Sequence, residues 1–289
     1  MSAQLLDGRV LALQLKQQLQ GAIEDLRNVN KTVSVVSITF GQDSGASSYL
    51  KSQRKITQEL GIQYREINFS EVIQQEDLLN HIKQINKDYG VHGVIINKPL
   101  PSYIDYSLII NHLDPAKDIE GLGERNLGRL LLGKNSLVPC TAAAALALLK
   151  SCDVNLKGKE ALVIGRSEIV GKPMALLLLK QDMTVTVCHS KTRNIEEHVN
   201  RADVVVAALG QKRFVQGDWI KEGAIVIDVG INDDNGKIVG DVDFDACFKK
   251  ASFITPVPGG VGPITSVMLM KNALEAYAGR PQVSIERAI

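Results

Sequence analysis

Residues 160–179 read EALVIGRSEIVGKPMALLLL, and this stretch indicates the fold of the second half of the chain. Glu160–Ile164 predicts a strand and Met174–Leu179 predicts a helix. Between them Gly165 begins a turn, and Pro173 suits a first helical turn, where its missing N–H group is not needed. Such a turn lets backbone amides face an anionic group. Because the motif departs from GxGxxG, a plain strand-to-helix turn explains it equally well.

Strand-like and helix-like runs alternate on both sides of this stretch, which is typical of parallel sheets covered by helices on both faces. In the second half, further strands are predicted at Thr184–Cys188, Val204–Ala208 and Ile225–Val229. The first half predicts strands at Val33–Phe40, Ile62–Ile67 and Val91–Asn97, and helices at Ser47–Leu60 and Glu76–Tyr89. Between the halves, Thr141–Leu149 predicts an alanine-rich helix, and Ile264–Tyr277 predicts a last amphipathic helix that could pack on either half.

Length and composition bound the function without naming it. At about 150 residues per domain, 289 residues correspond to two domains. Lys and Arg number 33 against 32 Asp and Glu, and aromatic residues make up 4%, which argues against a nucleic-acid partner. The longest apolar run, Ala142–Leu149, is far shorter than the roughly 20 residues that span a bilayer. Without a leader sequence or a cysteine framework, we expect a cytoplasmic protein with no membrane partner.

The loops after the strands predict a dinucleotide site. After Thr184–Cys188 the chain reads HSKTR, with no acidic residue to hold a ribose 2′-hydroxyl. Together with Arg166, the cations of this loop favour the 2′-phosphate of NADP by charge complementarity, although a solvated basic loop is the alternative. Small residues at 207–210 and 228–232 would permit close approach of a flat ring. The fold class is therefore α/β, with two α/β domains, the second a Rossmann-like doubly wound parallel sheet, and a cleft between them.

Six motifs occur in the order found in one enzyme family: GRSEIVGKPMALLL, TVTVCHSKT, ADVVVAALG, IVIDVGIN, GDVDF and TPVPGGVGPIT. Over essentially its whole length the chain resembles the methylenetetrahydrofolate dehydrogenase/cyclohydrolase family. The resemblance implies a folate domain at 1–140 with the C-terminal helix 264–289, an NADP domain at 141–263, and a homodimer joined through the NADP domain. It implies that the cofactor is bound by Gly165, Arg166, Ser167, Ser190, Lys191 and Ile231. It implies that Pro258, Gly259, Gly260, Val261, Gly262 and Pro263 border the folate site.

The first half departs from the family pattern at the positions that would bind and convert folate. The family's Tyr-x-x-x-Lys motif appears as Tyr49 and Gln53, four residues apart and therefore on one helix face. Its Gln-Leu-Pro-Leu-Pro appears as Asn97-Lys98-Pro99-Leu100-Pro101. Its Lys-Asp-Val-Asp-Gly appears as residues 117–121, KDIEG, with Glu120 in place of the aspartate thought to hold the pterin. The expected catalytic set is Tyr49, Gln53, Asn97 and Glu120, with Lys98 and Pro99 in substrate binding.

These departures bear on the second of the family's two reactions. Hydride loss from methylene-tetrahydrofolate to NADP needs positioning but no obligatory side-chain acid. Hydrolysis of the methenyl product needs proton transfers, which a lysine can provide and Gln53 cannot. We therefore expect a dehydrogenase with a weak or lost cyclohydrolase. The alternatives are a fully bifunctional enzyme, or a non-catalytic NADP-binding paralogue acting as a sensor or partner.

No metal site is expected, because the five histidines lack the spacing of metal ligands. Nucleophilic catalysis is not expected either, because no nucleophile motif occurs. Asp241-Val242-Asp243 resembles a paired-carboxylate site. A turn near the folate pocket or the domain junction is the preferred interpretation of this segment.

Overall fold

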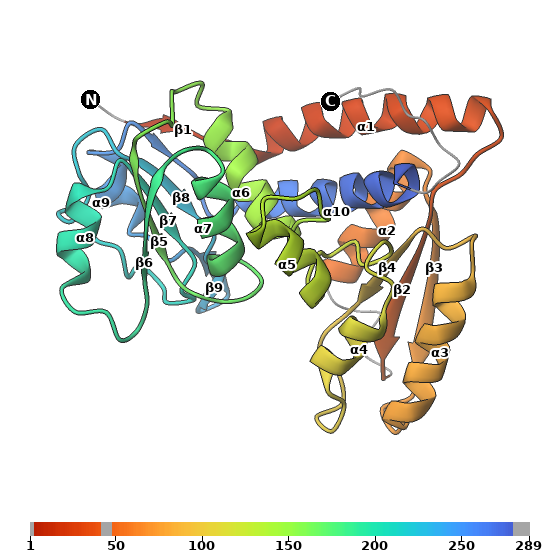
Figure 1. The fold of residues 1–289 in the computed structure, drawn as a ribbon. Coiled ribbons are helices and arrows are strands. Elements are labelled where there is room, and N and C mark those ends of the chain that lie inside the picture. Colours follow the sequence, from red (N-terminus) through yellow and green to blue (C-terminus); the bar gives the residue numbers. More distant parts are fainter. Residues whose placement is uncertain (1–2, 42–47, 280–289) are drawn as a thin grey trace. The chain divides into compact units, whose positions relative to one another are not determined.

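The computed structural model describes residues 3–41 and 48–279, which belong to two compact units (Figure 1). The six-stranded unit holds the described residues of 1–14 and 139–265. The three-stranded unit holds those of 15–138 and 266–289. The predicted start of a helix at Ser47 and the last part of the predicted segment 264–289 lie outside the described residues.

In the six-stranded unit, all strands of the sheet are parallel, in the order β1-β11-β8-β7-β5-β6. The chain runs from β5 outward to β6 on one side, and then returns to β7 and β8 on the other side. The strand order therefore reverses at β5, the kind of place where open α/β sheets bind ligands. The bounds are β1 Gln4–Leu5, β5 Glu160–Ile164, β6 Thr184–Cys188, β7 Val204–Ala207, β8 Ile225–Asp228 and β11 Phe253–Ile254.

Residues 1–14 differ from the predicted domain division, which placed them with the first half. Their strand β1 pairs in parallel with β11, with Gln4 opposite Phe253, so they extend the six-stranded sheet. The short two-residue strands gave no periodic signal that could reveal this pairing. The helix α1, Gly8–Asn28, then leads into the three-stranded unit, and the last helix, α10, spans Val261–Ala278.

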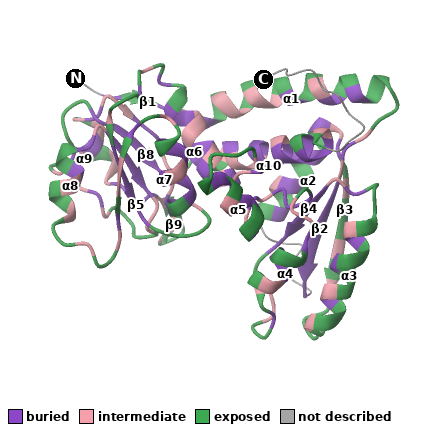
Figure 2. Ribbon diagram, in the orientation of Figure 1, coloured by how far each residue is buried: buried purple, intermediate pink, exposed green. Residues whose placement is uncertain are grey.

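Helices cover both faces of the six-stranded sheet, as parallel strands buried on both faces require. Contacts place α6 and α7 against β8, β5 and β6, whereas Val199 of α8 and Cys247 of α9 pack with Val205 and Val226. Figure 2 shows the inner strands of this sheet, such as β5 and β8, mostly in the colour of buried residues. The helices are α6 Cys140–Lys150, α7 Gly171–Leu179, α8 Ile195–Arg201 and α9 Phe244–Phe248, and an antiparallel hairpin is formed by β9 Asn232–Asp234 and β10 Lys237–Val239.

The three-stranded unit contains a parallel sheet in the order β3-β2-β4 whose two faces differ in polarity. Val36, Ile38 and Phe40 of β2 pack against α3 and α4 in an apolar core. On the opposite face, Ser37 and Thr39 are buried as well, at 0% and 2% exposure. The elements are β2 Ser34–Phe40, α2 Ser48–Leu60, β3 Gln63–Phe69, α3 Gln75–Lys87, β4 Gly93–Ile96, α4 Tyr106–His112 and α5 Glu124–Leu131.

Across residues 3–41 and 48–279, no helix is long and apolar enough to cross a membrane.

Candidate active site

The turn after β5 packs closely against its neighbours, as a cradle for an anionic ligand should. Gly165 has a φ of +127°, and a Cβ there would collide with the carbonyl oxygen of Ala208, which follows β7. A Cβ on Gly171, the first residue of α7, would collide with the carbonyl oxygen of Gly165. Glycine is therefore required at both positions, and the start of α7 lies directly beside the turn.

The predicted cofactor residues of β5 and β6 follow the carboxyl ends of these two neighbouring strands. Ile164 lies opposite Cys188 in the parallel ladder, and Gly165 donates a backbone hydrogen bond to the carbonyl oxygen of Cys188 over 2.8 Å. The residues that follow, Arg166 and Lys191 among them, are exposed. Two cations thus stand at the carboxyl ends of two paired strands. This fits a dinucleotide phosphate, and Ser167 and Ser190 are exposed at the same ends.

A buried carboxylate shapes the loop after β7. Asp241 accepts backbone hydrogen bonds from Leu209, Gly210 and Gln211 at 2.7, 2.9 and 2.9 Å. It also accepts one from the side chain of Asn232 at 2.9 Å. The acidic segment at 241–243 is thus a loop anchor of the six-stranded unit.

A second carboxylate, Asp228 at the end of β8, organises the next loop. It accepts backbone hydrogen bonds from Gly230, Asp241 and Val242 at 2.9, 3.0 and 2.9 Å. Burial raises the pKa of Asp228 to about 7, and the neighbouring Asp241 acts in the same direction. Ile231, in the same loop, is 70% exposed, so this predicted cofactor contact presents an apolar side chain to solvent.

The glycine-rich loop that the resemblance assigns to the folate site belongs to the six-stranded unit, together with the start of α1. Gly8 donates to the carbonyl oxygen of Gly259 over 2.9 Å, and a Cβ on Gly8 would collide with the carbonyl oxygen of Gly260. Gly259 has a φ of +111°. Pro258, Gly259 and Gly260 lie in the loop, whereas Val261, Gly262 and Pro263 form the first turn of α10.

Gln53 lies at the centre of a buried hydrogen-bond network in the three-stranded unit. Its side chain is 0% exposed on α2, facing the polar side of the sheet. Its Nε2 donates to Oδ1 of Asn97 over 2.9 Å. Its Oε1 accepts from the hydroxyls of Ser37 at 3.0 Å and Tyr64 at 2.9 Å. Both polar atoms of the Gln53 amide are therefore engaged by neighbouring side chains.

The direction of these hydrogen bonds is set by a backbone carbonyl. Nδ2 of Asn97 donates to the carbonyl oxygen of Ile38 at 2.9 Å and to Oγ of Ser37 at 2.7 Å. Oδ1 of Asn97 must therefore face Gln53 and accept, which turns Oε1 of Gln53 toward Ser37 and Tyr64. Ser37, Gln53 and Asn97 close a ring in which each residue donates to the next.

The basic residues near Gln53 in sequence do not take the place of a lysine. Lys51 and Lys55 are exposed, and Arg54 forms a bidentate ion pair with Glu66 of β3. Neighbouring positions on a helix face different directions, which explains the separation from Gln53.

Glu120, Lys98 and Tyr106 form a second group in the three-stranded unit. Oε2 of Glu120 accepts from the backbone N–H of Ile96 over 3.3 Å, and the residue is half-buried. Burial raises the pKa of Glu120 to about 7, Asp118 raises it further, and the charge of Lys98 opposes both. Nζ of Lys98 lies 4.0 Å from the ring centroid of Tyr106. Tyr49, the remaining predicted substrate residue, is 38% exposed on α2.

The other charged residues of the KDIEG segment have structural roles. Lys117 is 3% exposed and donates from Nζ to the carbonyl oxygens of Ile85, Asn86 and Asp88 at the end of α3. Asp118 accepts from three backbone amides of 121–123 and from Asn126. They fix the loop that carries Glu120.

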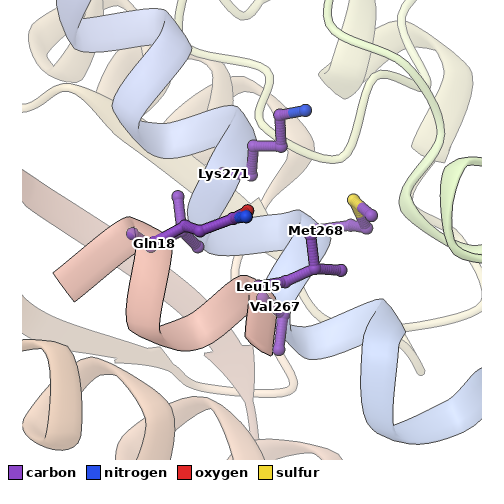
Figure 3. A pocket seen from close by; sticks show the side chains of 6 residues that line it. Leu15, Gln18, Val267, Met268 and Lys271 are labelled. Carbon is purple, nitrogen blue, oxygen red and sulfur yellow. The ribbon is translucent and has the colours of Figure 1, made fainter. Parts of the chain in front are cut away.

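A small surface hollow between α1 and α10, within the three-stranded unit, contains none of the predicted site residues (Figure 3). Its lining is mostly apolar, so it offers no catalytic chemistry. The lining residues are Leu15, Gln18, Leu19, Val267, Met268 and Lys271. In the described part of the chain, no three His, Cys, Asp or Glu side chains gather closely enough to hold a metal ion.

The doubly wound parallel sheet, its reversal at β5 and the tight glycine turn together define a dinucleotide-binding α/β protein. Comparison with known sequences shows to which family of dinucleotide-binding proteins the chain belongs. Residues 6–120 match the catalytic domain of tetrahydrofolate dehydrogenase/cyclohydrolase, and residues 139–280 match its NAD(P)-binding domain. The chain belongs to this family, whose enzymes act in folate one-carbon metabolism.

Individual relatives cover nearly the whole chain. The bifunctional protein FolD of Clostridium tetani is 45% identical over 273 residues, which is 94% of this chain and 98% of the relative. The structure of the FolD dehydrogenase/cyclohydrolase from Campylobacter jejuni superposes with a TM-score of 0.92 at 40% identity, covering 95% and 98% of the two chains. That of Trypanosoma brucei, complexed with NADP cofactor and an inhibitor, gives 0.89 at 36%, covering 96% and 98%.

Several residues of the site were not expected from the sequence. Ser37 and Tyr64 bind Gln53, Tyr106 lies beneath Lys98, and Asp228 supports the loop after β8. Ser37 did leave a signal, because it is a hydroxyl residue within the otherwise apolar strand SVVSITF. Tyr64 and Tyr106 left none, since neither belongs to a recognisable motif.

Proposed function

We propose that this enzyme oxidises methylene-tetrahydrofolate to methenyl-tetrahydrofolate with NADP, and that its cyclohydrolase step is weak or lost. The observation that supports the proposal is the closed ring of Ser37, Gln53 and Asn97, joined by Tyr64. In this ring the position of the family's lysine is held by an amide whose oxygen and nitrogen are both engaged.

For the oxidation, the chain must bind and orient its ligands. NADP, when bound, accepts the hydride from the methylene carbon. The exposed cations Arg166 and Lys191 would neutralise the 2′-phosphate, and Gly165 allows the close backbone approach that phosphate binding needs. Tyr49 and Glu120 would hold the folate, and Gln53 would support them from its buried network. None of them must exchange a proton with the substrate during hydride loss, so the oxidation tolerates glutamine at position 53.

For the hydrolysis, a proton must be moved while water adds to the methenyl carbon. Amides do not titrate, so neither Gln53 nor Asn97 can accept the proton of that water. Burial raises the pKa of Tyr64 to about 12, which keeps its hydroxyl protonated near neutral pH. The network around position 53 therefore lacks an acid or base that works near pH 7. Positioned acid–base groups typically contribute about 10²–10⁴-fold to such steps.

One observation favours the alternative of a fully bifunctional enzyme. Glu120 has a pKa raised to about 7, so its carboxyl can give and take a proton near neutrality. In that case the proton-handling group would have moved from position 53 to Glu120. Replacement of Glu120 by Gln would then abolish hydrolysis, while oxidation would continue at saturating methylene-tetrahydrofolate.

The deciding experiment follows NADPH and the methenyl product together in one progress curve, starting from methylene-tetrahydrofolate and NADP. The proposal expects NADPH and methenyl-tetrahydrofolate to accumulate in parallel, with the methenyl species decaying at its spontaneous rate in the same buffer. Decay faster than the enzyme-free control would overturn the loss of cyclohydrolase. If Glu120→Gln then slows that decay to the control rate, the bifunctional alternative is correct.

Two further parts of the proposal are the cofactor preference and the assembly state. We expect NADP to be preferred over NAD because of Arg166 and Lys191 at the predicted 2′-phosphate position. We also expect a homodimer joined through the six-stranded unit, as the family resemblance implies, and sedimentation analysis tests it. Calorimetry separates the enzyme from a non-catalytic sensor, since a sensor for another molecule would bind NADP and no folate.

A further inference from the structure

Tyr106 carries a buried hydroxyl that none of the residues described by the structure hydrogen-bonds. The residue begins α4, and its ring packs at the edge of the core formed by β2, β4, α3 and α4. A buried hydroxyl without a partner loses its hydrogen bonds to water and gains none in return. Such a group in a folded protein requires an explanation.

The surroundings of this hydroxyl are those of the proposed folate site. Nζ of Lys98 lies 4.0 Å from the ring centroid. Burial raises the pKa of the Tyr106 phenol above its usual range, and Glu120, Asp118 and Tyr49 act in the same direction. The hydroxyl therefore keeps its proton near neutral pH and acts as a hydrogen-bond donor. Three of these neighbours, Lys98, Glu120 and Tyr49, are predicted substrate residues.

Tyr103, three residues earlier, shows that this part of the structure can provide hydrogen-bond partners for a tyrosine hydroxyl. The hydroxyl of Tyr103 donates to the carbonyl oxygens of Glu71 and Ile73, at 2.6 and 3.0 Å. Tyr103 is 53% exposed, whereas the hydroxyl oxygen of Tyr106 is buried. The tyrosine that could reach water has two backbone partners, and the one withdrawn from water has none among the described residues.

We propose that Tyr106 is a substrate-binding residue whose hydroxyl donates a hydrogen bond to an acceptor atom of the pterin ring. Glu120, whose charge acts on the Tyr106 phenol, is an acceptor when ionised and would take the N–H donors of the same ring. A donor and an acceptor side by side match a heterocycle that presents both kinds of group along one edge. This inference rests on the proposed function, because it takes folate as the ligand.

The test compares Tyr106→Phe with the matched control Tyr103→Phe in the full-length protein. Phenylalanine keeps the ring beneath Lys98 and removes the hydroxyl alone. Calorimetry with tetrahydrofolate gives the folate Kd, steady-state kinetics give kcat and both KM values, and thermal unfolding gives the Tm of the free protein. We expect Tyr106→Phe to raise the folate Kd and the KM for methylene-tetrahydrofolate about 3- to 10-fold, as the loss of one hydrogen bond predicts.

The same variant should leave the KM for NADP unchanged and should leave the Tm of the free protein unchanged or higher, because no bond of the free protein is lost. Tyr103→Phe should show the opposite pattern, with a lower Tm and an unchanged folate Kd. The inference is overturned if Tyr106→Phe binds tetrahydrofolate as the wild type does, or if it lowers the Tm and raises both KM values together. Absence of tetrahydrofolate binding by the wild type would instead refute the proposed function itself.

Discussion

Nε2 of Gln53 donates to Oδ1 of Asn97 over 2.9 Å, so two of the residues that depart from the family pattern are hydrogen-bonded to each other. The resemblance implies a lysine and a glutamine at these positions. Here an amide pairs with a shorter amide, and Ser37 closes the ring between them. Gln53 and Asn97 thus belong to one connected arrangement in which each side-chain oxygen and nitrogen has a hydrogen-bond partner. Such an arrangement is what a buried polar cluster needs in order to be stable.

Gln53→Lys is expected to destabilise the protein although it restores the family residue. The introduced amine has no acceptor function, so the hydroxyl of Ser37 loses the oxygen to which it donates, and a cation is buried at a site with 0% exposure. Urea unfolding should show a loss of about 1–3 kcal/mol. Burial would lower the pKa of that amine, so methenyl hydrolysis should rise above the wild-type rate at a pH where the amine is neutral.

Gln53→Met is the matched control for this experiment, because it keeps the side-chain length and adds no titratable group. It should lose stability without gaining hydrolysis. Equal hydrolysis by the lysine and methionine variants would show that a titratable group at position 53 is not what the hydrolytic step lacks.

The hydrogen-bond network around Gln53 predicts which of its residues contributes more to the free energy of unfolding. Ser37→Ala removes the donor to Gln53 and the acceptor for Asn97, and it leaves both amides short of a partner. Tyr64→Phe removes one donor to an oxygen that Ser37 still holds. Urea unfolding should therefore show a loss of about 1–3 kcal/mol for Ser37→Ala and about 1 kcal/mol or less for Tyr64→Phe. The reverse order would contradict the bond directions assigned here.

Glu120 should make stability and folate binding depend on pH in opposite directions. Its pKa rises on folding from the ordinary 4.5 to about 7, so the folded protein holds this proton more tightly than the unfolded chain. The corresponding stabilisation is complete below the unfolded pKa and is lost as the pH rises through 7. If Glu120 binds the pterin as proposed, its ionisation creates the acceptor, and the KM for methylene-tetrahydrofolate should fall between pH 6 and 8.

Glu120→Gln should flatten both pH profiles. Lys98→Gln removes the positive charge that lowers this pKa, and it should move the midpoint of the KM profile to higher pH. A KM profile that keeps its midpoint in both variants would assign the titration to another group.

Cofactor choice should respond to charge at the ends of β5 and β6. Arg166→Ala and Lys191→Ala should each raise the KM for NADP about 10-fold while changing the KM for NAD little, because we propose that these cations neutralise the 2′-phosphate. Lys180→Ala removes an exposed cation at the opposite end of α7 and serves as the control. Equal effects on NADP and NAD would place the cations away from the 2′-phosphate.

Asp241→Asn should loosen the loop after β7. Asp241 is 0% exposed and accepts three backbone amides there, and an amide nitrogen in place of one oxygen cannot accept. The unfolding free energy should fall by about 1.5–3 kcal/mol, and NADP binding measured by calorimetry should weaken. Asp243→Asn is the control, because the side-chain bond of Asp243 to the N–H of Ala246 at 3.3 Å is an N-cap that asparagine makes equally well.

The regular elements that carry the two sheets could be predicted from the sequence because their patterns are local. Glu160–Ile164 and Thr184–Cys188 form strands with the predicted bounds, since β-branched runs between turn residues leave little ambiguity. The helix at Gly8–Asn28 was not predicted, and the two-residue strands at Gln4–Leu5 and Phe253–Ile254 were too short to recognise. Their pairing depends on tertiary contacts over almost the whole length of the chain.

The residues of the candidate site also divide into those that could be predicted from the sequence and those that could not. The i, i+4 spacing of Tyr49 and Gln53 and the family motifs made Gln53 and Asn97 visible in the sequence. Ser37 and Tyr64 reach Gln53 from two neighbouring strands, and this meeting depends on the register of the sheet, in which Val35 lies opposite Tyr64. Spacing along the chain cannot predict a contact that the register creates.

Each unit contains segments from distant parts of the sequence, and this limits the order in which the units can fold during translation. The six-stranded sheet takes one of its two edge strands from residues 4–5, although its other strands begin only at residue 160. The three-stranded unit is joined late as well, because Asn272 of α10 donates to the carbonyl oxygens of Ile119 and Val138. During translation, β1 leaves the ribosome long before the strands it joins, and α10 leaves it long after the other elements of the three-stranded unit. The two units therefore cannot fold one after the other as the first and then the second half of the chain is synthesised. Residues 4–5 of the nascent chain must stay unpaired until β11 has emerged.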